Sequence, residues 1–422
     1  MIGLAPGKAR RHESEQSLEE LGGLVRAAGG RPSLRMIQER PHPDPATFLG
    51  RGKLVELSAA CDEQRIDLVV CDHELTPTQL RHLEEALHLR VIDRTQLILD
   101  IFAKRARTRE GQSQVELAQL KYLLPRLAGH GTELSRLGGG IGTRGPGETK
   151  LETDRRRIRS RIASVSAGIE AIRERRARLR DRRQKSDLPT VALVGYTNAV
   201  KTTLFNLLTG ESAEASDALF VTLDPLLRKV RLPDQRELLL SDTVGFIDRL
   251  PHTLVAAFRG TLEEVRDADA LLHVIDASAD DRDRRVAAVR TVLKDVGAED
   301  VPCVDVYNKA DKLRPDERRR LAAACPDAAI VSALRAHGRR ELLERVVAIL
   351  GLGTSRVRLR CDPDSDAGRR GMTWVYRHGR VVRHVNRGGR AHIEAEVPRR
   401  EFAAFRKRMA EAPLAALSMS DV

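Results

Sequence analysis

The chain of 422 residues has few aromatic side chains, few cysteines and no long apolar run. Aromatic residues make up 3% of it, with Trp374 as the single tryptophan, which disfavours recognition of unpaired bases by stacking. Its five cysteines are scattered and form no C-x-x-C pair, which argues against a disulfide framework or structural zinc. No run approaches the ~18 apolar residues of a membrane span, and the first apolar stretch is too short for a signal peptide. We therefore expect a cytoplasmic protein with no integral membrane segment.

Positive charge is in excess, with a net charge of +13 and a sequence pI near 9.9. Such an excess favours a polyanionic partner, most often nucleic acid, although an arginine-rich chain with solvated surfaces would show it too. Residues 150–185 contain 14 Lys or Arg against 5 Asp or Glu, so most of the net charge lies in this one segment. With so few aromatics, we expect contacts to phosphates and backbone rather than to bases.

Residues 1–106 predict a small parallel α/β domain, because short apolar runs alternate with helical patterns. The predicted strands are 33–38, 67–72 and 89–94, and the predicted helices are 52–64, 76–88 and 95–106. The stretch GRGK at 50–53 resembles a fragment of a phosphate loop but lacks the full motif, so we interpret it as a tight turn before a helix.

Residues 107–187 predict a basic antiparallel helical hairpin. In its first helix, leucines recur every three or four residues, at Leu117, Leu120, Leu124 and Leu127. The second runs over about 148–187 and carries an apolar seam at heptad spacing, consisting of Ile158, Ile162, Val165, Ile169, Ile172 and Leu179. Because one apolar stripe needs a partner, we expect the two helices to pack together.

Between these helices lies a glycine-rich tip loop, residues 128–147. A flexible linker would explain the glycines, but linkers are usually rich in serine and polar. Leu137 and Ile141 stand among the glycines here, and the cations Arg136 and Arg144 are interleaved. We therefore interpret the tip as a probe that contacts a crowded polyanion.

Residues 188–351 predict an α/β domain that begins with a near-match to the phosphate-loop pattern G-x-x-x-x-G-K-[ST]. Gly195 opens the pattern and Lys201-Thr202 closes it, but Val200 stands where the second glycine belongs. Strand runs are expected at 190–195, 236–245, 270–278, 302–311 and 328–333.

Two later strand ends carry companion motifs. The run 242–245 is Asp-Thr-Val-Gly, where an aspartate reaches Mg²⁺ through water and a glycine amide meets the γ-phosphate. The run 308–311 is Asn-Lys-Ala-Asp, and the Asp311 carboxylate can accept from guanine N1–H and the 2-amino group, donors that adenine lacks. The backbone around Ala333 could donate to guanine O6. Together they predict a guanine-nucleotide site.

Residues 352–422 predict a small α+β domain, with strands at 355–361, 371–379 and 390–397 and a helix near 399–411.

Nearly the whole chain resembles the HflX family of translational GTPases, in the Era–Obg group. The resemblance rests on DRTQLILDIFAKRARTREGQSQVELAQLKYLLPRL, LSRLGGGIGTRGPGETKLETDRR and LFVTLDP. It implies that Lys201 contacts the β- and γ-phosphates, that Thr202 binds Mg²⁺ directly and that Thr222 joins Mg²⁺ when GTP is bound. It also implies binding to the ribosome, with the tip near the peptidyl-transferase region of the large subunit, and splitting of stalled or idle ribosomes under stress.

The chain departs from common GTPase patterns at three places. Phe246 stands where many GTPases have a Gln that orients water, which agrees with the family and implies slow intrinsic hydrolysis. Val200 and the pair Leu226-Leu227 differ from the family, which has glycine at the first position and usually a threonine at the second. A β-branched residue adds bulk beside the β-phosphate, unless Val200 has helical angles and points aside.

Two hypotheses follow: a monomeric, ribosome-binding GTPase that uses Mg²⁺, or a ribosome-binding protein whose nucleotide domain is a non-catalytic scaffold. In the first, the catalytic residues are Lys201, Thr222 and Gly245, and the metal ligands are Thr202 and Thr222. The expected nucleotide contacts are Gly195, Tyr196, Thr197, Asn198, Ala199, Val200, Lys201, Thr202, Phe220, Val221, Thr222, Leu223, Asp224, Asp242, Thr243, Val244, Gly245, Asn308, Lys309, Ala310, Asp311, Ser332, Ala333 and Leu334.

Overall fold

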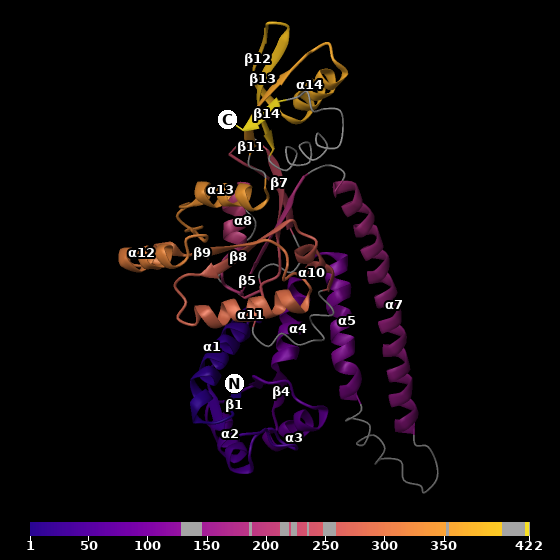
Figure 1. The fold of residues 1–422 in the computed structure, drawn as a ribbon. Helices are drawn as coiled ribbons and strands as arrows, with labels where there is room; N and C mark the ends of the chain where they lie inside the picture. Colours follow the sequence, from indigo (N-terminus) through magenta and orange to yellow (C-terminus); the bar gives the residue numbers. More distant parts are fainter. Residues whose placement is uncertain are drawn as a thin grey trace.

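The computed structural model describes residues 1–127, 146–184, 188–211, 219–220, 226–233, 236–247, 259–351, 354–398 and 418–421. Three sheets organise these residues, and helices cover them (Figure 1). The expected α/β class is confirmed. The domain boundaries given above remain predictions.

The first sheet has the order β2-β1-β3-β4, with all neighbours parallel. Its strands are β1 (Ile2–Ala5), β2 (Met36–Glu39), β3 (Leu68–Cys71) and β4 (Arg90–Asp93), and its helices are α1 (Arg11–Ala27), α2 (Arg51–Glu63), α3 (Pro77–Leu87) and α4 (Arg94–Arg105). The three expected strands and three expected helices are confirmed. Of the stretch 50–53, which we expected to form a turn before a helix, only Gly50 precedes the helix, because Arg51, Gly52 and Lys53 already lie in α2. Sequence reasoning missed β1 and α1. Strand β1 has four residues, all buried, and so shows no alternation.

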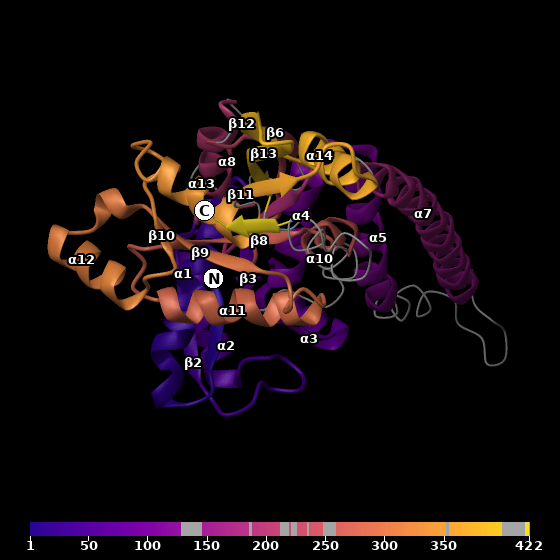
Figure 2. The same cartoon turned by 45° about the horizontal axis from the view of Figure 1, so that its top comes forward.

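The helical hairpin is confirmed: α5 (Arg109–Arg126) and α7 (Pro146–Gln184) lie side by side and run antiparallel (Figures 1 and 2). The seam of α7 is buried or half-buried from Ile158 to Ile172, with Val165 only 7% exposed. Arg161 on α7 also forms a bidentate ion pair with Glu116 on α5, at 2.6 and 3.0 Å. The loop 128–145, which makes up most of the expected tip, lies outside the described residues.

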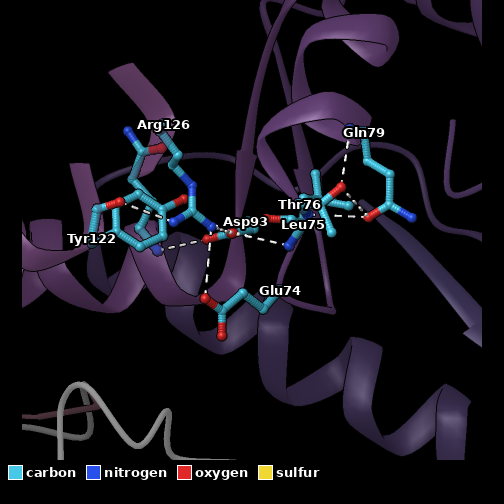
Figure 3. Close-up of polar contacts among 8 residues, drawn as sticks. Glu74, Leu75, Thr76, Gln79, Asp93, Tyr122 and Arg126 are labelled. Carbon is cyan, nitrogen blue, oxygen red and sulfur yellow. Dashed lines mark hydrogen bonds and ion pairs between the residues drawn. The ribbon is translucent and has the colours of Figure 1, made fainter. Parts of the chain in front are cut away.

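The C-terminal end of α5 is bound to the first sheet by hydrogen bonds (Figure 3). The Arg126 guanidinium donates to the Leu75 carbonyl at 2.8 Å and to the fully buried Asp93 carboxylate at 3.2 Å, and it stacks 3.5 Å from the Tyr122 ring centroid. Asp93 also accepts from the Leu75 amide at 3.1 Å. These contacts hold the C-terminal end of α5 in place against the first sheet.

The second sheet has the order β10-β9-β8-β5-β7-β6, in which only β6 is antiparallel. Its strands are β5 (Thr190–Gly195), β6 (Leu226–Arg231), β7 (Glu237–Asp242), β8 (Ala270–Asp276), β9 (Cys303–Asn308) and β10 (Ala329–Ile330). Its helices are α8 (Lys201–Thr209), α10 (Arg259–Arg266), α11 (Arg282–Asp295), α12 (Pro315–Ala324) and α13 (Arg339–Ile349). All five expected strands are confirmed. Strand β6 was missed because it is an edge strand rich in cations.

The third sheet has the order β12-β13-β11-β14, all antiparallel, formed by β11 (Thr354–Cys361), β12 (Arg380–Arg387), β13 (Arg390–Pro398) and β14 (Ser418–Asp421). The strand expected at 371–379 is wrong: this segment lies in helix α14 (Asp366–His378). Met372, Trp374 and Tyr376 imitate strand alternation, but the buried positions Gly368, Gly371 and Val375 follow helical spacing. The Ser365 hydroxyl caps this helix by accepting from the Gly368 amide at 3.0 Å. The helix expected near 399–411 lies outside the described residues.

A single hydrophobic core joins the first two units. Leu18, Leu21 and Leu24 of α1 belong to the same cluster of buried side chains as Phe246 and Ile247 of the second unit. The rings of Phe102 on α4 and Phe220 meet edge to face, with their centroids 4.6 Å apart. The N-terminal unit and the second sheet are thus held against each other by apolar packing.

Candidate nucleotide site

The loop between β5 and α8 has the tight turn that a phosphate loop requires. Gly195 has φ +153°, and a Cβ there would lie 2.3 Å from the Val274 carbonyl oxygen, so only glycine fits. Asn198 and Val200 both have φ +62°, in the left-handed region. Asparagine tolerates this region, whereas a β-branched residue is strained in it.

Val200 precedes α8 with φ 62° and ψ 44°. The alternative in which Val200 has ordinary helical angles is therefore wrong. Its carbonyl still accepts from the Leu204 amide at 3.2 Å, so the helix starts normally. Valine at position 200 is therefore unfavourable because of its left-handed backbone conformation, in addition to the bulk of its side chain.

Lys201 is the first residue of α8, and its side chain turns back onto the loop, with 7% of its surface exposed. Its ammonium donates to the carbonyls of Gly195 at 3.1 Å and Tyr196 at 3.2 Å. Burial lowers the pKa of Lys201 to about 8, against an opposing effect of Asp242. Gly245 closes over this lysine, because a Cβ there would lie 3.0 Å from the Lys201 Nζ.

The lowered pKa of Lys201 predicts pH-dependent nucleotide binding. Phosphates favour the ammonium form, and that form is lost in the free protein as the pH rises through about 8. Above this pH, binding must take up a proton, so GDP should bind roughly 5- to 10-fold more weakly at pH 9 than at pH 7.5. Calorimetry in buffers of different ionisation enthalpy would measure affinity and proton uptake together. A flat affinity with no proton uptake would contradict the prediction.

The strand end at Asp242 faces the start of α8. The Thr202 hydroxyl donates to the Asp242 carboxylate at 2.9 Å, and the buried Thr243 hydroxyl donates to the Leu193 carbonyl at 2.5 Å. A hydroxyl beside a carboxylate offers the hard oxygen donors that Mg²⁺ prefers, so these residues fit the expected metal. Within the described part of the chain, no group of three or more His, Cys, Asp or Glu could hold a metal ion.

Phe246 joins the companion motif to the loop through the backbone. Its amide donates to the Gly195 carbonyl at 3.0 Å, and its carbonyl accepts from the Thr197 amide at 2.7 Å. The Phe246 side chain is 3% exposed and packs in the shared core, as does that of Val244. A side chain held there cannot orient water over the loop.

The Asn-Lys-Ala-Asp motif at 308–311 is also hydrogen-bonded to the phosphate loop. The Asn308 side-chain Nδ2 donates to the Ala199 carbonyl at 3.1 Å, and the Asn308 Oδ1 accepts from the Ala333 backbone amide at 3.0 Å. Lys309 pairs with Asp276 at 2.6 Å. Burial raises the pKa of Asp276, but hydrogen bonds from Lys309 and Ser278 outweigh burial and hold it low.

Asp311 accepts a hydrogen bond from the Ser332 hydroxyl, which fixes the carboxylate that sequence reasoning assigned to guanine. The Ala310 amide donates to the Val331 carbonyl at 3.1 Å, and Leu334 is 76% exposed beside this loop. The structure thus brings the phosphate loop and both companion motifs together at one edge of the sheet. Phe220 instead lies in the shared core, and residues 221–224, with Thr222, lie outside the described residues.

Residues from the N-terminal unit at the edge of the loop were missed by sequence reasoning. The Tyr196 hydroxyl donates to Glu20 on α1, and the Arg94 guanidinium at the start of α4 pairs with the same carboxylate. No local pattern could have indicated these partners, because 176 residues separate Glu20 from Tyr196.

A mixed sheet with a phosphate loop, an Asp-Thr-Val-Gly strand end and an Asn-Lys-Ala-Asp strand end defines a phosphate-loop GTPase. Three family descriptions match: GTP-binding GTPase N-terminal over residues 15–103, GTP-binding GTPase Middle Region over 105–183, and 50S ribosome-binding GTPase over 190–309. The chain belongs to the HflX family of GTPases.

Similar proteins cover most of the chain. GTPase HflX of Caldanaerobacter subterraneus subsp. tengcongensis is 54% identical, over 71% of this chain and 70% of that protein. GTPase HflX of Escherichia coli K12 is 50% identical, over 72% of this chain and 71% of that protein. A solved GTP-binding protein from Sulfolobus solfataricus in complex with GDP aligns with 83% of this chain and 98% of its own, at 24% identity and a TM-score of 0.42.

None of the helices in the described ranges combines the length and the apolarity that crossing a bilayer would require.

Proposed function

We propose that the chain binds GTP with Mg²⁺ at this site, hydrolyses it to GDP and phosphate, and couples that cycle to splitting or rescue of ribosomes under stress. The observation that carries the nucleotide part is the convergence of Lys201, Asp242 and Asp311 on one edge of the sheet. The monomeric state and the cytoplasmic location inferred from the sequence belong to this proposal.

Each part of the site has a role in this proposal. Lys201 would neutralise the β- and γ-phosphates, and the Gly245 amide would meet the γ-phosphate. Thr202 and Thr222 would hold Mg²⁺, which neutralises phosphate charge when it is bound. Asp311 would select guanine. Because Phe246 is buried, the chain supplies no side chain there to orient water, and hydrolysis would be slow until a partner positions it.

The hairpin supports the ribosome part of the proposal. Helix α7 presents exposed Arg156, Arg157 and Arg159. Arg126 fixes the end of α5 that precedes the tip loop in the sequence. Matching of residues 190–309 to a family described as a 50S ribosome-binding GTPase points to the large subunit, and the tip would contact the rRNA of its peptidyl-transferase region.

The tip should be needed for binding to the large subunit. Deletion of residues 138–142, or the double change Arg136→Glu and Arg144→Glu, should weaken cosedimentation with large subunits several-fold. The charge reversal should also lower the salt dependence of binding, because fewer phosphate contacts form and fewer counterions are released. The double change Arg319→Glu and Arg320→Glu on α12 alters the charge equally and is the matched control. Undiminished binding of the tip variants would refute the role of the tip.

A second function has one observation in its favour. The left-handed conformation of Val200 strains the loop, which would suit a ribosome-binding protein whose nucleotide domain is a scaffold. A fluorescent-GDP titration of the chain against Val200→Gly separates the two functions.

A further inference from the structure

Tyr196 is the residue of the phosphate loop that the N-terminal unit holds. Its side chain is 7% exposed, and its hydroxyl donates to the Glu20 carboxylate on α1. The cation of Arg285 on α11 lies over the ring, 5.3 Å from its centroid. The position that follows the first glycine of the loop is therefore fixed from two sides, one of them outside the nucleotide unit.

Glu20 is itself anchored in a buried charge network. The Arg94 guanidinium pairs with Glu20 and, at 2.8 Å, with Asp72, which in turn accepts from the Ser17 hydroxyl at 2.6 Å. Arg94 is 3% and Asp72 is 2% exposed. Burial disfavours the charge on Arg94, but Glu20 and Asp72 outweigh it and raise the pKa of the guanidinium. Interactions between buried charges are strong and directional, so Glu20 has little freedom to move.

The backbone of Tyr196 connects this anchor to the phosphate-binding groups. Its carbonyl accepts from the Lys201 ammonium at 3.2 Å and from the Ala199 amide at 3.3 Å. The flanking residues Gly195 and Thr197 both bond to the backbone of Phe246. A shift of Tyr196 would therefore disturb the lysine and the glycine-bearing strand end together.

A cavity of about 700 Å³ lies between α1 and this loop. Gln16, Glu19 and Glu20 line it from α1, while Tyr196, Thr197 and Asn198 line it from the loop. The Tyr196 ring packs in the apolar core that joins the two units, whereas its hydroxyl reaches the Glu20 carboxylate, and both residues line this cavity.

We propose that Glu20 is a positioning residue for the nucleotide site, which holds the phosphate loop in its binding conformation through the Tyr196 hydroxyl. This inference rests on the proposed nucleotide site. It gives Glu20 of α1 a role at the nucleotide site, although no residue of α1 belongs to a nucleotide motif. By linkage, a ligand that moves α1 changes nucleotide affinity, and nucleotide binding changes affinity for that ligand by the same factor.

The test uses the full chain and the variants Tyr196→Phe, Glu20→Ala and their combination. Tyr196→Phe removes only the hydroxyl, so the Arg94 pair with Glu20 remains. Glu19→Ala, one residue away on the exposed face of α1 and lining the same cavity, is the matched control. Two readouts are measured: amide hydrogen exchange of residues 195–201 without nucleotide, and affinity for GDP with Mg²⁺.

We expect faster exchange of 195–201 in Tyr196→Phe and in Glu20→Ala, with no change in Glu19→Ala. GDP affinity should fall about tenfold in each of the first two variants, the order expected for a hydrogen bond to an ionised group. The combination should be little worse than either single variant, because both remove the same link. Unchanged exchange in Tyr196→Phe, or fully additive losses, would overturn the role of Glu20. If neither the chain nor Val200→Gly binds GDP, the proposed nucleotide function fails, while the exchange readout still decides the positioning role.

Discussion

Replacement of Val200 by glycine should tighten GDP binding ~10- to 100-fold, the range expected when one charge-assisted amide contact is restored. Residue 200 has φ 62° in this loop, where an L-residue is disfavoured by ~1–2 kcal/mol and glycine is not. Valine can relieve this strain by moving its amide, and nucleotide binding would then have to restore the strained conformation. Calorimetry with GDP and Mg²⁺ measures the difference.

Ala336 provides a matched control for this change. It also has a left-handed backbone, with a φ of 52°, but it is exposed and is not among the expected nucleotide contacts. Ala336→Gly should therefore alter GDP affinity little. Equal affinities of the parent chain and Val200→Gly would refute the strain argument and favour the active GTPase. Binding seen only in Val200→Gly would favour the scaffold function for the chain that carries Val200.

The change Asp311→Asn should reverse base preference. GDP affinity should fall ~100-fold, because guanine loses an ionised acceptor for two donors, each contact being of the order of 1.5–3 kcal/mol. Xanthosine diphosphate should then bind more tightly than GDP, since the new amide can donate to the xanthine 2-oxygen. Competition against a fluorescent nucleotide gives both affinities.

Asp327→Asn is the control for this change, because Asp327 is exposed in the same unit and precedes β10. It should leave both affinities unchanged. Retention of full guanine selectivity by Asp311→Asn would mean that the carboxylate held by Ser332 does not read the base.

Sequence reasoning succeeded where a single segment carries its own signal. Strands β5, β8 and β9 are buried runs bounded by turns, and the seam of α7 repeats over several turns, so both were predictable. It failed at β1, which is too short for a pattern, and at α14, where alternating large side chains hid the helical spacing of Gly368, Gly371 and Val375.

The site divides in the same way. The phosphate loop and each of its companion motifs are short continuous stretches of sequence. Each follows a parallel strand, and parallel strands bring their carboxyl ends to one edge of the sheet. The left-handed angles of Val200 follow from the closure of the loop and not from the identity of its residues. Glu20 and Arg94 could not be assigned to the loop, because their pairing depends on how two separate units pack.

The shared core also constrains how the chain is made. Leu18 of α1 is synthesised roughly 280 residues before Ala298, which belongs to the same buried cluster, and at ~5–20 residues per second this interval lasts about 14–56 s. Throughout that time the apolar face of α1 leaves the translating ribosome without its final cover. Nascent chains of this protein should therefore depend on holding chaperones until α11 and Ala298 emerge, more than chains in which each domain folds as soon as it is synthesised.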